Sequence, residues 1–166
     1  MTTSPAEDQA ARPTWRDLRD PVRLLALGFG SGLVPAAPGT AGSLIGSAAA
    51  LLAAQWGAWL AAAITAVVVL AGFWICGEGA RRLGVHDHPA IVWDEIAGMM
   101  ITMLAAPRGW GWAALAFALF RAFDIIKPWP IREIDHAMRG GAGIMLDDVM
   151  AGILAALGLL LARSIT

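Results

Sequence analysis

Five long apolar stretches, separated by short breaks rich in glycine, proline or charge, limit most strongly how this chain can fold. They cover Thr40–Gln55, Ala58–Cys76, Ile91–Ala106, Trp110–Ile126 and Ile144–Ala162. The chain is 58% hydrophobic and only 15% charged, with a mean hydropathy of +0.64, which is above the range of ordinary globular proteins. In a bilayer, backbone amides and carbonyls must be hydrogen-bonded within the protein, so such stretches are expected to be helices. The sequence predicts an all-α integral membrane protein with about five transmembrane helices.

Two segments precede the first of these stretches. Residues 1–20 combine Ala, Pro, Thr and charge without periodicity, and we expect a mobile polar tail followed by one helical membrane domain over residues 21–166. Val22–Val34 is apolar but glycine-rich and too short to cross a bilayer, which favours an interfacial or re-entrant segment. A cleavable signal peptide is not expected, because acids occur in the polar head and glycines interrupt the apolar run.

The basic residues predict an orientation. One side of the expected bundle has two arginines, Arg108 and Arg163, whereas the side with the amino terminus has Arg12, Arg16, Arg19, Arg23, Arg81, Arg82, Lys127, Arg132 and Arg139. The positive-inside rule then places the amino terminus and the polar loops in the cytoplasm. Tryptophans are expected at both interfaces, with Trp56, Trp59, Trp110 and Trp112 outside and Trp15, Trp93 and Trp129 inside. A net charge of −1 gives no basic field for nucleic acid.

Six acids fall at the predicted cytoplasmic ends of the spans, although they are far apart in sequence: Asp87, Asp94, Glu95, Asp124, Asp147 and Asp148. Converging carboxylates suit a hard cation, Mg²⁺ in particular. Adjacent acids on a helix point about 100° apart, so one member of each pair can face the bundle centre. The alternative is that acids in a first helical turn only complement the helix dipole. That explains one acid per helix more easily than two, so Asp87, Asp94, Glu95, Asp147 and Asp148 are the candidate metal ligands.

Two further groups could act on a phosphate. One group has a spacing of three residues and consists of Arg121, Asp124 and Lys127. This spacing suits a structural ion pair between Arg121 and Asp124. The alternative is that Arg121 and Lys127 bind a phosphate. Gly39, Thr40 and Ser43 occur at an expected helix start, where backbone amides and hydroxyls can bind an anion, as at any capped helix.

The histidines leave several interpretations open. His86 and His88 could be solvated loop residues, proton donors to a leaving oxygen or, with carboxylates, zinc ligands. A serine, cysteine or histidine nucleophile has no support, because the sequence lacks Gly-x-Ser-x-Gly, Cys-x5-Arg and Pro-Ser-Gly-His. The single cysteine, Cys76, is expected to be a packing residue.

Four motifs, in order over about residues 22–163, resemble those of the phosphatidylglycerophosphatase A family. They are Leu27–Leu33 with Pro38–Thr40 and Gly42-Ser43; Val85–His88 with Val92–Glu95; Phe120-Arg121, Asp124 and Lys127–Ile131; and Gly140-Gly141, Gly143-Ile144 and Asp147-Asp148. The resemblance implies a Mg²⁺-dependent phosphatase of the inner membrane that converts phosphatidylglycerophosphate to phosphatidylglycerol. It does not assign the roles of individual acids.

The residues allow a coherent mechanism for such an enzyme. Mg²⁺ on Asp94, Glu95, Asp147 or Asp148 would polarise the phosphoryl oxygens, and Arg121 and Lys127 would stabilise the added charge. Asp124 or a metal-bound water would supply the nucleophile, and His86 or His88 would protonate the leaving oxygen. A cation- or proton-coupled transporter is the alternative, but it should have acids near the bilayer midplane and inverted repeats, and we find no internal repeat. A membrane scaffold would not need six acids on one side.

Overall fold

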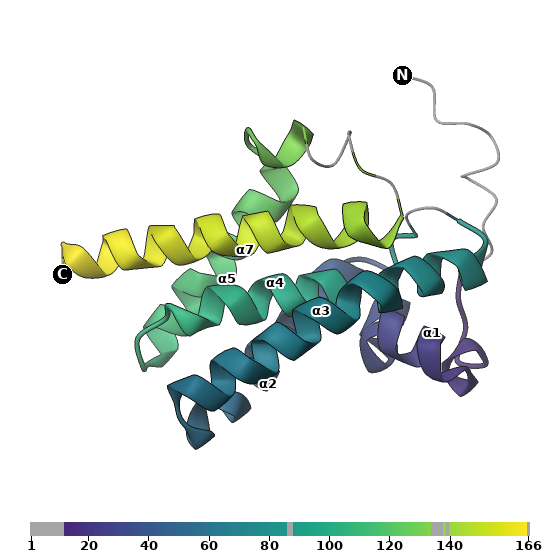
Figure 1. The fold of residues 1–166 in the computed structure, drawn as a ribbon, viewed down its shortest axis with the longest axis horizontal. Helices are drawn as coiled ribbons and strands as arrows, with labels where there is room; N and C mark the ends of the chain where they lie inside the picture. The colour runs from purple at the N-terminus through teal and green to yellow at the C-terminus, as the bar shows by residue number, and fades with distance from the viewer. Residues whose placement is uncertain (1–11, 86–87, 134–137, 139, 166) are drawn as a thin grey trace.

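The computed structural model describes residues 12–85, 88–133, 138 and 140–165, and within these the chain is helical and has no strand (Figure 1). The α-helices with complete bounds are α1 (Pro21–Ala26), α2 (Pro38–Ala53), α3 (Ala58–Leu83), α4 (Trp93–Leu104), α5 (Trp110–Ile126) and α7 (Gly141–Ser164). Short 3-10 turns cover Asp17–Arg19, Gly28–Leu33 and Ala54–Trp56. The prediction of an all-α fold is confirmed.

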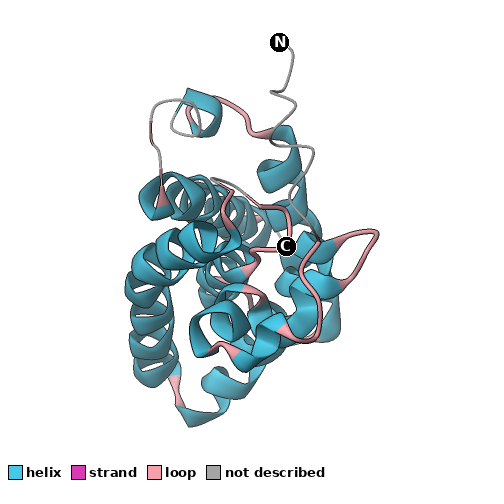
Figure 2. Cartoon of the chain, turned by 90° about the vertical axis from the view of Figure 1, so that its right-hand side faces the viewer, coloured by secondary structure: helices cyan, strands magenta, loops and turns pink. Residues whose placement is uncertain are grey.

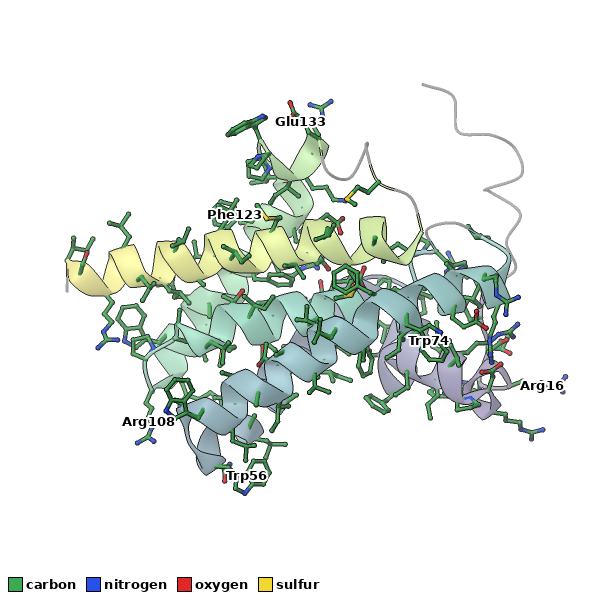
Figure 3. The ribbon with its side chains drawn as sticks, viewed as in Figure 1. Arg16, Trp56, Trp74, Arg108, Phe123 and Glu133 are labelled. Atoms are coloured by element: carbon green, nitrogen blue, oxygen red, sulfur yellow. The ribbon has the colours of Figure 1, made fainter. Side chains whose placement is uncertain are left out.

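Helix α4 is the centre of the bundle. It packs against α2, α3, α5 and α7, and most of its residues are buried, including Met99, Met100 and Thr102. The beginnings of α4 and α7 and the end of α3 lie toward the same end of the molecule, onto which Figure 2 looks. The turns that follow α2 and α4 lie at the other end, where Figure 3 shows Trp56 and Arg108 far from Arg16. Glu133, which follows α5, lies about midway between these ends in the same view, so the segments that the sequence assigned to one side do not all lie at one end.

Two helices are long and apolar enough to cross a membrane, α3 and α7, which is fewer than the five predicted. The reason is helix length. The other three helices have 16, 12 and 17 residues, or about 18–26 Å at 1.5 Å per residue, against a hydrocarbon core of about 30 Å. The stretch Ile91–Ala106 is longer than its helix, because Ile91 and Val92 precede α4 and Ala105 and Ala106 follow it, whereas Trp110–Ile126 coincides with α5.

Trp93, which was predicted near the inner end of its span, is the first residue of α4, and its side chain is buried. It is 8% exposed and belongs to a core cluster with Ile75, Ala97 and Met145. Its indole N–H donates a 3.0 Å hydrogen bond to the carbonyl of Val68 in the middle of α3. This tryptophan therefore anchors the first turn of α4 against α3. The other tryptophans predicted at the inner side, Trp15 and Trp129, are exposed, at 74% and 77%.

The segment before α2 is compact. Val22–Val34 forms α1 and a 3-10 turn, as a stretch too short to span would, and Asp20 caps α1 by accepting from the N–H groups of Val22 and Arg23. Both oxygens of Asp20 also accept from Arg82 at the end of α3, at 2.7 Å, and the Arg82 hydrogen bond holds the pKa of Asp20 below its usual value of 3.8. These contacts join the residues before α1 to the end of α3.

Candidate active site

A polar cavity of about 120 Å³ lies at the end of the bundle where α4 and α7 begin. Four parts of the chain line it: the loop before α4, the first turn of α4, the end of α5 and the first turns of α7. The lining residues are His88, Pro89, Ile91, Asp94, Glu95, Asp124, Lys127, Ile144, Asp147 and Asp148. All of the predicted acids that the structure describes are among them, which supports the prediction that these acids converge.

Three carboxylates in this cavity are close enough to bind one ion. One oxygen each of Asp94, Glu95 and Asp148 lies within 4.8 Å of the other two. Asp94 and Asp148 are buried, and Oε2 of Glu95 is a buried oxygen that has no hydrogen-bond partner among the described residues. A buried carboxylate oxygen without a donor is costly, and a cation would compensate it. The set of oxygen ligands therefore fits a hard divalent cation such as Mg²⁺.

Close packing between α4 and α7 brings these acids together. A Cβ placed on Gly152 would lie 2.5 Å from the carbonyl oxygen of Gly98, and one placed on Gly98 would lie 2.6 Å from the carbonyl oxygen of Asp148. Thr102 reinforces the contact, since its hydroxyl lies 3.0 Å and 3.3 Å from the carbonyls of Gly98 and Gly152. Gly98 follows Asp94 by four residues, and Gly152 follows Asp148 by four, which is about one helical turn. The close contact between the helices therefore lies one turn from the two acids, on the same faces, and brings them together.

Arg121 and Gly39 adjoin the same carboxylates. A Cβ on Gly39, in the first turn of α2, would lie 2.3 Å from Oε1 of Glu95 and 3.1 Å from Nη1 of Arg121. The missing side chain of Gly39 leaves room for these two charged groups at the start of α2, where backbone N–H groups lack helical partners. Arg121 also forms an ion pair with Asp124, as its spacing suggested. The same contact places the guanidinium beside the acids.

Lys127 and Asp147 form the other charged pair of the cavity. Nζ of Lys127 donates to Oδ2 of Asp147 at 2.7 Å, while the backbone N–H of Asp148 donates to Oδ1 at 3.0 Å. Lys127 ends α5 in a left-handed conformation, with φ 44°. Asp147 is not among the three carboxylates that meet, although the sequence placed it with the metal ligands.

His88 is buried and lines the cavity. Its Nδ1 accepts a 3.1 Å hydrogen bond from the N–H of Ala90. Since a backbone N–H always donates, Nδ1 carries no hydrogen in this arrangement and the ring proton is on Nε2. His86 and Asp87, the other candidates in this loop, lie outside the described residues.

The other residues predicted at this helix start, Thr40 and Ser43, lie apart from the cavity lining. Helix α2 begins at Pro38 and has no side-chain cap. Ser43 is fully buried, and its hydroxyl donates to the carbonyl of Gly39 within the helix. Thr40 is half-buried in the first turn. Neither Thr40 nor Ser43 is among the described residues that line the cavity.

Carboxylates able to hold a cation beside an arginine and a lysine, in a helical fold with two candidate membrane spans, are the combination expected of a membrane-associated protein that acts on phosphate groups. A family model described as Phosphatidylglycerophosphatase A matches residues 24–163. The chain belongs to this family, and with it to the phosphoric monoester hydrolases.

Three curated relatives agree in length with this chain. A phosphatidylglycerophosphatase A of Haemophilus influenzae is 48% identical, covering 83% of this chain and 86% of its own. One of Escherichia coli is 42% identical, covering 94% and 91%. A putative phosphatidylinositol-3-phosphatase of Bacteroides thetaiotaomicron is 39% identical, covering 84% and 92%. No solved structure matches.

Proposed function

We propose that this chain is a Mg²⁺-dependent phosphatidylglycerophosphatase, which hydrolyses the terminal phosphomonoester of phosphatidylglycerophosphate to phosphatidylglycerol and phosphate. Besides family membership, the proposal is supported by one observation above all: the oxygens of Asp94, Glu95 and Asp148 meet within 4.8 Å in a cavity that two cationic side chains adjoin. A phosphomonoester dianion needs this combination of a metal site and fixed positive charge.

Asp94, Glu95 and Asp148 would hold the ion. Bound there, Mg²⁺ supplies a Lewis acid for the phosphoryl oxygens and lowers the pKa of water. Arg121 binds the phosphate by donating from its guanidinium, and its ion pair with Asp124 keeps it in place beside the start of α2. Lys127 provides the second positive charge.

Asp124 and His88 act on the two sides of the ester. Asp124 lines the cavity as a carboxylate and can accept a proton from the attacking water. His88 presents Nε2–H, because the N–H of Ala90 occupies Nδ1. It therefore stabilises the leaving glycerol oxygen as a neutral hydrogen-bond donor, and that oxygen takes the proton of the new hydroxyl from solvent.

The position of the cavity at the end of the bundle suits a lipid headgroup. We place the chain in the inner membrane as a multi-pass protein, with α3 and α7 crossing the bilayer in contact with each other and the three shorter helices packed around them. The cavity and the amino terminus face the cytoplasm in this arrangement, since the basic residues around them outnumber those at the other end. The acyl chains of the substrate remain in the bilayer while its terminal phosphate enters the cavity.

Phosphate release by the purified chain in detergent micelles tests the substrate. We expect phosphatidylglycerophosphate to be hydrolysed with a kcat/KM at least about tenfold above those of phosphatidylinositol 3-phosphate and phosphatidic acid. The name of the Bacteroides relative makes the phosphoinositide the informative competitor. Preference for either competitor would assign the chain another lipid substrate, and no release from any of them would contradict phosphatase activity.

A further inference from the structure

We propose that Asp147 is a positioning residue for Lys127 and not a ligand of the metal ion. The inference rests on the proposed function. It gives the two adjacent acids different roles: Asp148 faces the other carboxylates, and Asp147 holds the lysine that binds the substrate phosphate.

The contacts of Asp147 are the first argument. Its Oδ2 accepts from Nζ of Lys127 at 2.7 Å, and its Oδ1 accepts from the backbone N–H of Asp148 at 3.0 Å. Each oxygen therefore already has a donor from the chain itself. Asp148, by contrast, brings one oxygen to within 4.8 Å of oxygens of Asp94 and Glu95. Adjacent residues on a helix point about 100° apart, so the two carboxylates serve different neighbours.

The backbone of Lys127 is the second argument. The residue closes α5 with φ 44° and ψ 62°, its N–H donating to the carbonyl of Phe123. This left-handed helix end is usually a glycine, because a side chain is disfavoured there. A lysine at such a position directs its side chain off the end of α5 toward α7, where Asp147 receives it. The lysine then depends on a partner that limits its rotamers, because a long side chain loses much conformational freedom when it is fixed.

The two roles predict different kinetic effects. A positioning carboxylate that orders a phosphate-binding lysine contributes to substrate binding, so its loss raises KM more than it lowers kcat. A metal ligand, when lost, weakens the affinity for the cation and lowers kcat. Because both partners act as one unit, removing Asp147 after Lys127 should have little further effect on KM.

The experiment compares Asp147→Asn, Asp148→Asn, Lys127→Met and the double variant Lys127→Met/Asp147→Asn, with Glu133→Gln as a control for loss of an exposed acid outside the cavity. Mn²⁺ affinity is measured by electron paramagnetic resonance on the full chain in detergent, without substrate, and KM and kcat are measured with phosphatidylglycerophosphate. Thermal unfolding identifies any variant that does not fold. Asp147→Glu, which keeps the charge, is the rescue variant.

We expect Asp147→Asn to keep the Mn²⁺ affinity within about twofold and to raise KM about tenfold, as Lys127→Met does, while Asp148→Asn weakens Mn²⁺ binding at least about tenfold. The double variant should match Lys127→Met, and Asp147→Glu should recover part of the loss in KM. A loss of Mn²⁺ affinity in Asp147→Asn equal to that in Asp148→Asn overturns the inference, as do additive effects on KM. Failure of the wild type to hydrolyse the lipid contradicts the proposed function instead, and the Mn²⁺ comparison still decides the role of Asp147.

Discussion

Replacing Gly152 with alanine should separate α4 from α7 and disable the metal site without changing any charge. The added Cβ would lie 2.5 Å from the carbonyl oxygen of Gly98 and 3.1 Å from its carbonyl carbon. These are backbone atoms, so no side-chain rotation relieves the clash. Ordinary contact begins near 3.4 Å, so the helices must move apart by about 1 Å, and overpacking of this kind costs about 1–3 kcal/mol. One turn away, the distance between Asp94 and Asp148 would grow by a similar amount.

A displacement of about 1 Å in a catalytic site can lower the rate about 100-fold. We therefore expect Gly152→Ala to lower kcat/KM, measured by phosphate release, by about 10- to 100-fold. The same variant should bind Mn²⁺ more weakly in a metal titration. Gly158→Ala is the matched control on the same helix, because its Cβ would meet only the end of the Leu119 side chain, at 3.4 Å. That variant should be as active as the wild type and about 0.5–1 kcal/mol more stable. Wild-type activity in Gly152→Ala would refute the packing argument.

Three other perturbations test separate parts of the structure. Gly39→Ala should reduce Mn²⁺ affinity, because its Cβ would lie 2.3 Å from Oε1 of Glu95, a proposed ligand. Gly111→Ala, whose Cβ would have no atom within 4 Å, should leave that affinity unchanged. The pKa of Asp20 is lowered in the folded protein, so its pairing with Arg82 stabilises the fold at pH values above the usual pKa, and this stabilisation is lost as the pH falls below that value. Thermal stability below about pH 4 should therefore decline more steeply in the wild type than in Asp20→Asn. His88→Gln should retain about a tenth or more of kcat, because the glutamine amide keeps a hydrogen-bond donor near the position of Nε2. His88→Ala, which removes that donor, should retain far less. Equal losses of kcat in both variants would instead favour proton transfer by the imidazole.

Sequence reasoning succeeded where the chemistry of single residues decides the outcome. Acids in an apolar chain predicted a common polar site, and the structure places Asp94, Glu95, Asp124, Asp147 and Asp148 around one cavity. The spacing of Arg121 and Asp124 also predicted their ion pair. Such inferences need only the helical period and the cost of unpaired charge in an apolar environment.

Prediction from the sequence was less successful for features that depend on three-dimensional packing, such as helix length and the surroundings of a side chain. Five apolar stretches suggested five spans of similar length, but only α3 and α7 are longer than their stretches, at 26 and 24 residues, and only these two are long enough. Trp93 looked interfacial because tryptophans often are, yet a carbonyl in α3 accepts from its indole in the core. The spacing of Asp94 to Gly98 and of Asp148 to Gly152 was visible in the sequence, but only the structure joins the two glycines into one contact.

The central claim is that a cation held by the converging carboxylates is required for hydrolysis. The most direct test is phosphate release from phosphatidylglycerophosphate after chelation, with Mg²⁺ then titrated back, for the wild type and for Glu95→Gln. We predict that chelation abolishes the activity and that added Mg²⁺ restores it in the wild type. The Glu95→Gln variant replaces the carboxylate whose buried Oε2 has no hydrogen-bond partner among the described residues, and it should need at least about tenfold more Mg²⁺ or stay inactive. Full activity in the presence of chelator, or an unchanged Mg²⁺ requirement in Glu95→Gln, would contradict it.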